Sequence, residues 1–545
     1  MTQIEDKFVD GTRSGSSQQS LNVASQLFAP GPSPIAPQDD TATQGSDHPV
    51  GHGPEASNGV DASQWAMPYC AAIQAYSEVD YLRLVVPGHG GSILAQPELA
   101  DLLGEQVLEL DVAPLVHGID QGPTPTALQQ SVQLAAQAWG ARRTWFLTNG
   151  ASKGNLVACL ALRHLGEHVV VERTVHSSVI DGMMLGGLSP HYIHPEVDAE
   201  VGAAHGLRPE ALAATLDTHP EAVAVYVVTP SYFGAVADVA ALAEVASAHN
   251  VPLVVDQAWG PHFGFHPALP ANALSAGADL VISSTHKLGG SLTQTAMLHL
   301  GHGRFAEQLE PVVNRAFRSM QSTSASSLLM MSLDATRHAL AVHGRERIQR
   351  SLDAVTELRA GIAAHGRFVD LSERFLRSPA VVAIDPLRVT IDTRAGGISG
   401  HAARQLLFHQ HRIHLEMATD SAVVAVVGAG AAPDIPRLLQ ALHDLPDQGA
   451  AHSASITLPE PGPMATTLRH AYFAPDELVP AERAVGRISA DAVAAYPPGI
   501  PNVLPGETLT QEVLDFLRDT AASPFGHIRG AADPAINQFR VLANM

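Results

Sequence analysis

Short, continuously apolar runs alternate with longer amphipathic runs between residues 125 and 299. Segments 222–228 and 251–255 are apolar at nearly every position, a pattern typical of strands that are buried on both faces. Segments 126–139 and 239–249 instead carry apolar residues at helical spacing. The alternation predicts an α/β fold, with a mostly parallel sheet that helices cover on both faces.

The same two patterns predict the remaining elements of this region. Further strands are expected at 145–147, 168–171, 192–193, 280–282 and 295–299, and further helices at 155–165, 177–185 and 209–216. In a parallel sheet of this kind, ligands bind beyond the carboxyl ends of the strands. Residues that directly follow a strand are therefore the first candidates for a functional site.

Changes in composition divide the chain into four parts. Residues 1–62 are rich in Ser, Gln, Pro, Gly and Asp and lack periodicity, which predicts a disordered extension. Residues 63–365 form the large unit, which has an N-terminal arm to about residue 124 and is expected to contain helices at 64–81 and 327–365. Residues 366–446 mix strands and helices in a smaller unit, and residues 457–545 form a C-terminal unit with a helix at 510–518.

Composition narrows the possible partners. The formal charge of −22 opposes binding to nucleic acid or to an anionic membrane. The sequence shows no run of 18 apolar residues and no secretory signal, and its two cysteines are too few for a disulfide framework. We therefore expect a soluble, cytoplasmic protein. No metal site is predicted, because HExxH spacing and a Cys-based zinc pattern are both lacking.

Two strand ends carry the strongest chemical signal. Asp256 directly follows the apolar run 251–255, and Lys287 follows the run 280–282 within the string Ser-Thr-His-Lys. A lysine amine and a strand-end carboxylate in neighbouring βα units suit pyridoxal 5′-phosphate (PLP). The lysine forms a Schiff base with this cofactor, and the carboxylate keeps the pyridine nitrogen protonated. Taken singly, Asp256 also fits a helix N-cap or turn residue, and Lys287 a surface lysine.

Three further segments are candidates for the same site. Segment 149–155, NGASKGN, has the small residues that let helix-start amides bind a phosphate, although a plain glycine turn with a serine cap looks the same. His176 follows strand 168–171 and is placed either to stack on the pyridine ring and donate a proton, or to face solvent as a loop histidine. Glu507 follows a Pro-Gly turn, where it would bind the distal cation of a basic substrate or remain a solvated acid.

Ordered motifs along most of the chain carry a family resemblance. They are PGHGG at Pro87, NGASKGN at Asn149, RTVHSS at Arg173, TPSYFG at Thr229, DQAWGPHFGFHP at Asp256, STHKLGGSLTQ at Ser284, STSASSLLMMSLD at Ser322 and GRISADAVAAYPPGIPNVLPGE at Gly486. With these motifs the chain resembles the Orn/Lys/Arg decarboxylase family over roughly residues 80–520, in the short form without an N-terminal wing domain. The resemblance implies a fold-type-I PLP-dependent transferase fold (aspartate aminotransferase-like) with smaller α+β C-terminal domains.

The resemblance also implies roles for single residues. Lys287 would be the Schiff-base lysine and Asp256 the partner of the pyridine nitrogen, with His176 and Ala258 on the two faces of the ring. The phosphate would be held by Ala151, Ser152, Ser284 and His286. The sites would form at the interface of a homodimer or larger homo-oligomer, with segment 322–324 reaching the neighbouring cofactor. The reaction would be α-decarboxylation of arginine, lysine or ornithine, and arginine is favoured because short-form relatives often act in polyamine synthesis.

The chain departs from the family pattern around these residues. Gln257, Trp259 and Pro261 stand where the family usually has Glu, His and Ala. Ser177 replaces the usual Lys, and Ala325 and Ser327 replace the usual Pro and Tyr. Two other functions therefore stay open, a fold-type-I aminotransferase or eliminase and a catalytically inactive regulatory paralogue. A transaminase usually holds the α-carboxylate with a bidentate arginine, and the intact lysine, aspartate and histidine argue against an inactive protein.

Overall fold

The computed structural model describes residues 61–449, 458–496, 500–523 and 526–543. The extension predicted at 1–62 lies outside the described residues, apart from its last two positions. Cys70 and Cys159 are both buried and free. None of the helices in the described part of the chain is long and apolar enough to cross a membrane.

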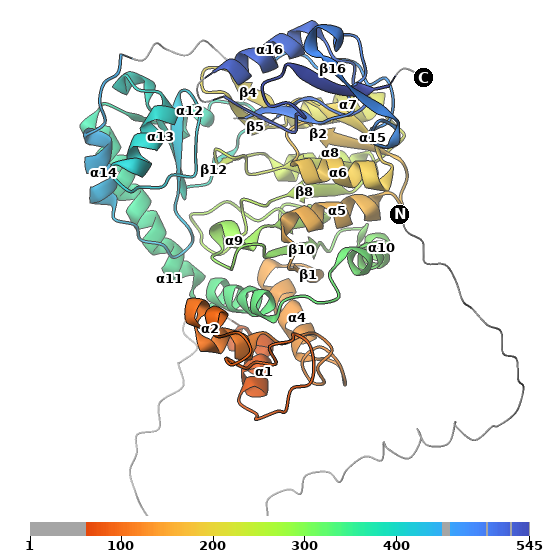
Figure 1. Cartoon of the computed structure of the whole chain (residues 1–545), viewed down its shortest axis with the longest axis vertical. Coiled ribbons are helices and arrows are strands. Elements are labelled where there is room, and N and C mark those ends of the chain that lie inside the picture. The colour runs from red at the N-terminus through yellow and green to blue at the C-terminus, as the bar shows by residue number, and fades with distance from the viewer. Residues whose placement is uncertain (1–60, 450–457, 497–499, 524–525, 544–545) are drawn as a thin grey trace, which may run out of the picture. The chain divides into compact units, whose positions relative to one another are not determined.

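A seven-stranded sheet forms the centre of the large unit, in the order β1-β10-β9-β8-β6-β2-β3 (Figure 1). Its strands are β1 (Arg143–Leu147), β2 (His168–Glu172), β3 (Ser189–Ile193), β6 (Ala222–Val228), β8 (Leu253–Asp256), β9 (Leu280–Ser283) and β10 (Ala296–Leu300). β10 runs antiparallel to β1 and β9, and the other neighbouring pairs are parallel. The predicted α/β fold with a mostly parallel sheet is confirmed.

Alternate residues of each central strand pack against opposite layers of helices. Val169 and Val171 of β2 pack with α5 (Gly150–Leu162), α6 (Ser177–Gly186) and α10 (Ala306–Met320). Val170, between them, packs with α7 (Pro209–Thr218) and α8 (Val239–Ala248). Burial of each such valine contributes about 1.5–3 kcal/mol, which explains why these strands are apolar on both faces.

The N-terminal arm differs from its prediction. It contains η1 (Ala62–Trp65), α1 (Pro68–Ser77), α2 (Pro97–Leu103) and α3 (Glu105–Leu110), and α4 (Ala127–Trp139) follows it. The single helix expected at 64–81 is wrong in extent. Pro68 lacks a backbone N–H and therefore starts a new helix instead of continuing the first one.

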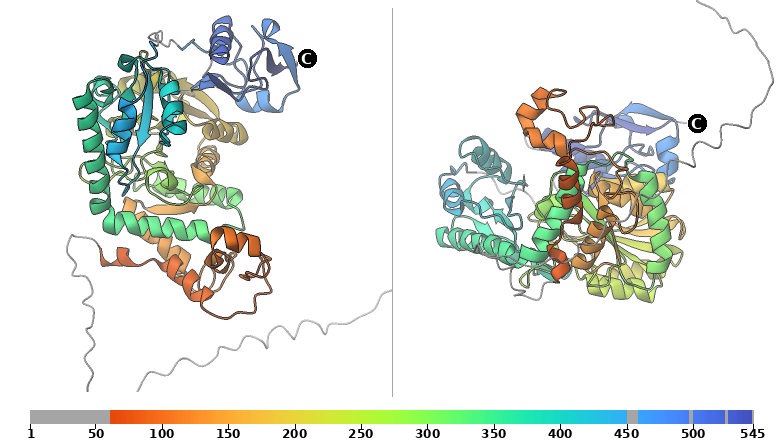
Figure 2. Two further views of the ribbon diagram at one scale, coloured as in Figure 1. Left: turned by 60° about the vertical axis from the view of Figure 1, so that its left-hand side comes forward. Right: turned by 90° about the horizontal axis from the view of Figure 1, so that it is seen from below.

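A long helix, α11 (Ser327–His365), leads into the small unit, which Figure 2 shows from two further sides. There β11 (Val369–Asp370), β13 (Arg388–Asp392), β15 (Ala422–Val426) and β14 (Met417–Ala418) form an antiparallel sheet in that order. The other elements are α12 (Ser372–Phe375), η2 (Arg394–Gly396), α13 (Gly400–His409) and α14 (Ile435–His443).

The C-terminal residues form small sheets beside one helix. β16 (Asp476–Pro480) pairs with β20 (Gln538–Leu542), and β17 (Val493–Tyr496) lies between β18 (Pro501–Val503) and β19 (His527–Arg529). The helical elements are α15 (Leu468–Phe473), η3 (Ala481–Arg483) and α16 (Gln511–Ala522). Two short pairs elsewhere are β4 (Glu196–Asp198) with β5 (Ala203–Gly206), and β7 (Ala235–Val236) with β12 (Ala383–Ile384).

Candidate active site

A cavity of about 240 Å³ lies at the carboxyl edge of the central sheet. Asp256 is the last residue of β8, and Lys287 lies in the short helix α9 (Thr285–Leu288), which follows β9. All eight residues that the sequence predicts for cofactor binding line this cavity, namely Ala151, Ser152, His176, Asp256, Ala258, Ser284, His286 and Lys287. Strand ends that lie far apart in the sequence thus meet at one edge, as expected for a parallel sheet.

Asp256 is fixed at the base of the cavity by two hydrogen bonds. The side-chain amide of Asn155 donates to its Oδ2 at 3.0 Å, and the backbone N–H of Ala258 donates to its Oδ1 at 3.0 Å. The other Asn155 contacts lock the amide in place, because it also donates to the Ser178 hydroxyl and accepts from the Tyr226 hydroxyl. The Asp256 side chain is therefore buried with its orientation set.

His176 has one tautomer that agrees with its neighbours. The backbone N–H of Ser178 donates to Nδ1 of His176 at 3.2 Å, and the Ser178 hydroxyl lies 2.8 Å from the same nitrogen. Because Nδ1 accepts, the neutral ring carries its proton on Nε2. Burial lowers the pKa of His176, and the nearby Lys287 adds to this shift while Asp256 opposes it. The ring is therefore a neutral donor through Nε2 near pH 7.

Lys287 lies in a setting that favours the free amine. Burial lowers its pKa to about 8, and the carboxylate of Asp256 opposes the shift. Its Nζ lies 3.9 Å from the centre of the Trp259 ring, and Cζ of Arg388 lies 4.0 Å from the centre of the same ring. Arg388 is fully buried and also contributes to the lowered pKa of the lysine.

The other end of the cavity can hold an anion. Ala151 and Ser152 lie in the first turn of α5, where backbone N–H groups have no acceptor within the helix and the helix dipole is positive. The Nδ1–H of His286 donates to the carbonyl of Thr295 at 2.9 Å, and the Ser284 hydroxyl lies 3.2 Å from Nδ1. His286 therefore has its Nε2 left for another partner.

These features fit PLP. A phosphate suits the start of α5, a basic ring nitrogen suits the fixed Asp256 carboxylate, and an aldehyde suits an amine with a pKa of about 8. Gly150 adds room at the phosphate end, since its φ of +76° and the open space around its α-carbon let the chain turn tightly into the helix.

Glu507 does not belong to this group. Its two carboxylate oxygens accept from Nη1 and Nη2 of Arg173 at 2.6 and 2.8 Å, and the backbone N–H of Leu504 donates to Oε2 at 2.8 Å. The residue is 3% exposed, so the expectation of a solvated loop acid is wrong. It is also not among the described residues that line the cavity, and its position gives no support for a substrate contact.

The positions that depart from the family pattern lie in different settings. Trp259 is half-buried in the cavity wall, whereas Ser177 is exposed at the start of α6. Ser327 is buried at the start of α11, where its hydroxyl donates to the Leu110 carbonyl at 2.7 Å. Among these positions, Trp259 is therefore the one placed to affect what the cavity binds.

Sequence reasoning missed two residues of the site. Asn155 was recognised only as the end of a motif, although it carries the hydrogen bonds to Asp256. Arg388 starts a buried strand of the small unit, where a charged residue is unusual, and this was the available signal. Asn155 and Arg388 lie in different elements, which come close to the cavity only in the folded chain.

Comparisons with known proteins agree with this geometry. The model described as "Orn/Lys/Arg decarboxylase, major domain" matches residues 67–425, and "Orn/Lys/Arg decarboxylase, C-terminal domain" matches residues 463–524. Arginine decarboxylase of Bacillus subtilis (strain 168) is 31% identical over 486 residues, which cover 88% of this chain and 98% of the relative. Constitutive lysine decarboxylase of Escherichia coli (strain K12) is 23% identical, over 83% of this chain and 77% of the relative.

The solved structure of that Escherichia coli lysine decarboxylase has the same fold, with a TM-score of 0.74 at 21% identity over 88% of this chain and 82% of the other. The major-domain match spans more than half of the chain, and the Bacillus subtilis relative exceeds 30% identity across most of it. The chain therefore belongs to the Orn/Lys/Arg decarboxylase family and has its fold-type-I architecture.

Proposed function

We propose that the protein is a PLP-dependent decarboxylase, which removes the α-carboxylate of a basic amino acid as carbon dioxide and releases the amine. The observation that carries this proposal is the presence of Lys287 and Asp256 in one cavity, on neighbouring strand ends. When bound, PLP supplies an aldehyde that condenses with amines and a protonated ring that takes up the electrons left by the departing carboxylate.

The residues of the chain have separate tasks in this reaction. Lys287 supplies the amine that holds the cofactor, and its lowered pKa keeps a useful share of this amine unprotonated near neutral pH. Asp256, held by Asn155 and Ala258, keeps a proton on the ring nitrogen. His176 offers the proton on its Nε2 to the carbon from which carbon dioxide has left.

Arginine is the substrate that we favour. The relatives from Bacillus subtilis and Halalkalibacterium halodurans are each named arginine decarboxylase and are 31% identical over 88% and 87% of this chain. The relatives named lysine decarboxylase are 23% identical. Incubation with arginine, lysine and ornithine in turn, followed by chromatography of the amines formed, tests the choice. Agmatine formation from arginine at the highest kcat/KM is expected, and preference for another amino acid contradicts it.

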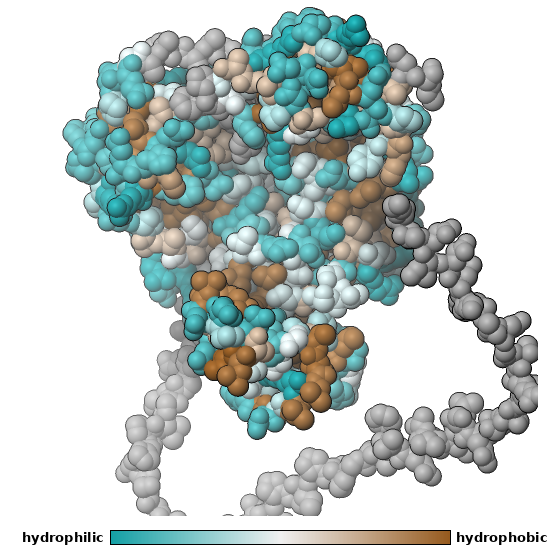
Figure 3. Space-filling view, viewed as in Figure 1, coloured by the Kyte–Doolittle hydropathy of each residue, from teal (hydrophilic) through white to brown (hydrophobic). Residues whose placement is uncertain are grey.

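We also propose a homodimer or a larger homo-oligomer as the active form. The N-terminal arm exposes large apolar side chains, including Leu82, Leu84 and Leu94 at 87, 84 and 88%. Figure 3 shows apolar residues gathered over this part of the molecule, around α1 and α2. An exposed apolar surface of this kind marks a protein contact. We propose a second copy of the chain as the partner, because the family resemblance implies active sites at the interface between identical subunits.

Replacement of the lysine tests the reaction itself. Lys287→Ala removes the amine that the cofactor needs, so the purified variant is expected to lack both the visible absorbance of the bound cofactor and the release of carbon dioxide. Arg377→Ala is the control, because Arg377 is an exposed cation of the small unit and does not line the cavity. A Lys287→Ala protein that keeps the absorbance band and turnover contradicts the proposal.

Transamination is the alternative reaction. Arg388 suggests it, because a transaminase holds the α-carboxylate with an arginine and this buried guanidinium lies next to Trp259 and Lys287. Its Nη1 already donates to the carbonyls of Ser231 and Tyr232, and its Nε lies 3.7 Å from Oδ2 of Asp385. Within the described residues, however, Nε and Nη2 have no hydrogen-bond partner, so the guanidinium keeps one edge free for a carboxylate and transamination stays an alternative to be tested. Labelled arginine separates the reactions, because decarboxylation yields labelled carbon dioxide and transamination yields a keto acid.

A further inference from the structure

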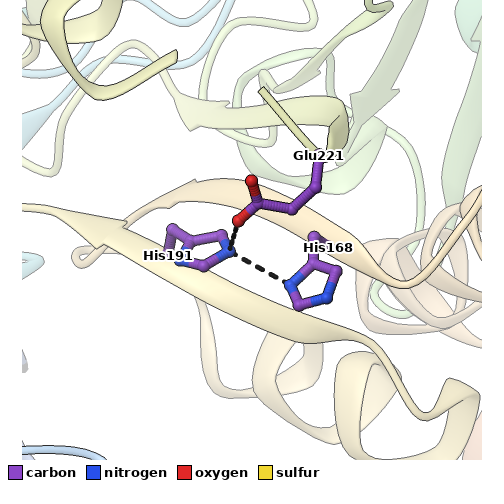
Figure 4. Close-up of side chains that lie close together, drawn as sticks. All are labelled: His168, His191 and Glu221. Atoms are coloured by element: carbon purple, nitrogen blue, oxygen red, sulfur yellow. Dashed lines mark hydrogen bonds and ion pairs between the residues drawn. The ribbon is translucent and has the colours of Figure 1, made fainter. Parts of the chain in front are cut away.

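A second group of reactive side chains lies away from the proposed active site. It consists of His168, His191 and Glu221 (Figure 4). His168 begins β2, His191 lies in β3, and Glu221 directly precedes β6. These strands are parallel neighbours, so the group lies at the amino edge of the sheet. At about 3.3 Å per residue, the length of β2 alone separates it from the carboxyl edge by roughly 13 Å.

The spacing of the three side chains matches the ligands of a metal ion. Nδ1 of His168 lies 3.1 Å from Nε2 of His191, which lies 3.2 Å from Oε1 of Glu221. All three atoms lie within 4.8 Å of one another. Ligand atoms about 2.1 Å from a tetrahedral zinc ion are about 3.4 Å apart, so an ion fits between these atoms with little movement.

Hydrogen bonding alone does not satisfy this arrangement. The Nε2 of His191 is close to both other groups, but a ring N–H lies in the ring plane and donates well to only one acceptor. If this Nε2 instead accepts from His168, its single lone pair is used for that bond, and the Glu221 oxygen 3.2 Å away receives no hydrogen from it. A divalent cation between the three groups is coordinated by all three lone pairs at once.

A fourth residue, His219, supports Glu221. Its Nδ1 lies 3.3 Å from Oε1 of Glu221, and its ring stacks on His191 with 3.7 Å between the centroids. A hydrogen bond of this type commonly orients a metal-bound carboxylate.

The position of the group also allows an ion to enter. His168 and His191 are half-buried and Glu221 is exposed, so the site borders solvent, and water can complete the coordination. The two histidines lie on paired strands of a sheet, which hold them more rigidly than loops do.

We propose that His168, His191 and Glu221 bind one divalent transition-metal cation, and that zinc suits this set of two imidazoles and one carboxylate best. The ion would join the edge strand β3 to β2 and to the start of β6, and so stabilise the folded chain. The proposal is independent of the PLP site. The sequence did not predict this site, because the three ligands come from separate segments of the chain and form no recognisable zinc motif.

Metal titration of the untagged holoenzyme, stripped by a chelator, tests the site. Zinc binding is measured by calorimetry, cobalt(II) coordination by its visible absorption, and stability by thermal unfolding with and without zinc. We expect the wild-type chain to bind one zinc ion more than His191→Ala does, and its unfolding temperature to rise with zinc. Glu221→Gln is expected to weaken binding by more than about 100-fold, and His219→Ala by about 10-fold, because groups that only orient a ligand contribute 10- to 100-fold.

His249→Ala is the matched control. His249 pairs with the carboxylate of Asp217 at 3.0 Å, but this pair belongs to no group of three ligands within the described residues. Its removal is expected to leave zinc binding unchanged. Because Glu221 is exposed, Glu221→Gln folds even if His191→Ala does not, and its cofactor absorbance verifies this. Equal zinc binding by the wild-type chain and Glu221→Gln, or no zinc binding by either, overturns the proposal.

Discussion

Asn155 shows how one side chain can set up several functional groups. Its amide nitrogen donates to both Asp256 and the Ser178 hydroxyl, and that hydroxyl lies beside Nδ1 of His176. The residue therefore fixes the orientation of the Asp256 carboxylate and, through Ser178, the tautomer of His176. Asn155 is a positioning residue, since these contacts act on the reacting groups through other side chains.

Replacement of Asn155 by Ala is expected to lower kcat/KM by about 10- to 100-fold. A hydrogen bond to a charged group contributes about 1.5–3 kcal/mol, and the variant loses the bond to the Asp256 carboxylate. The wavelength of the bound cofactor should also shift, which a purely structural role would not cause. Asn314→Ala is the control. Asn314 lies on α10, where its side chain accepts from the indole N–H of Trp145, and it does not line the cavity. An Asn155→Ala enzyme within twofold of the wild-type kcat/KM contradicts this role.

The lowered pKa of Lys287 predicts how the apoprotein takes up PLP at different pH values. The neutral amine is the reactive form, and a pKa of about 8 makes its fraction rise about tenfold between pH 7 and pH 9. A lysine with the usual pKa of about 10.4 gains about 100-fold over the same interval. Stopped-flow absorbance gives the uptake rate, and a small lysine derivative in the same buffers supplies the reference. Uptake that rises as steeply as the reference contradicts the effect of burial on this lysine.

At the scale of elements, the ion pair between Arg173 and Glu507 joins the end of β2 to the C-terminal unit. Both side chains are nearly fully buried. Glu507→Leu leaves the guanidinium buried and unpaired, and is expected to destabilise the protein by about 3–5 kcal/mol in thermal or urea unfolding. The double variant Arg173→Met with Glu507→Leu removes both charges and is expected to recover most of this loss. If Glu507 binds the substrate instead, KM rises strongly in both variants while the stability of the single variant stays near that of the wild type.

The central elements could be predicted because their burial leaves a strong pattern in the sequence. β6 and β8 are covered on both faces, and their residues are apolar throughout. Helix α10 was missed, although its apolar and charged residues alternate at helical spacing, because Pro311 lies inside it. The strands β16 and β20 were also missed, because each has only five residues and β16 is exposed at four of them.

At the scale of the whole molecule, the sequence indicated where the site lies but not all of its residues. Asp256 and Lys287 could be found because one ends β8 and the other lies in the short helix just after β9, and the parallel pairing of these strands brings them together. The contacts of Arg388 with Trp259 and of Glu507 with Arg173 join segments far apart in the chain, and nothing in the local pattern specifies them. The proposed zinc ligands could not be predicted for the same reason, since His168, His191 and Glu221 come together only when β2, β3 and β6 pair in the sheet.

The exposed apolar side chains of the N-terminal arm predict the oligomeric state. Leu82 and Leu94 are nearly fully exposed, and burial of each in a contact between two copies contributes about 1.5–3 kcal/mol. Leu82→Asp with Leu94→Asp is therefore expected to weaken association by about 100-fold or more and to lower turnover, because the exposed segment 322–324 then no longer reaches a neighbouring site. Light scattering should show the wild-type chain at twice 57.3 kDa or more, and the double variant near 57.3 kDa at low concentration.

Leu478→Asp provides the matched control for this double variant. Leu478 is 47% exposed on β16, in the C-terminal unit, so the same type of replacement there should leave mass and turnover unaltered. A double variant that keeps the wild-type mass shows that the arm is not the contact, and a wild-type chain at 57.3 kDa with full turnover shows that one copy holds a complete site. If only the arm variant dissociates and loses turnover, the apolar arm and the active site depend on the same neighbour.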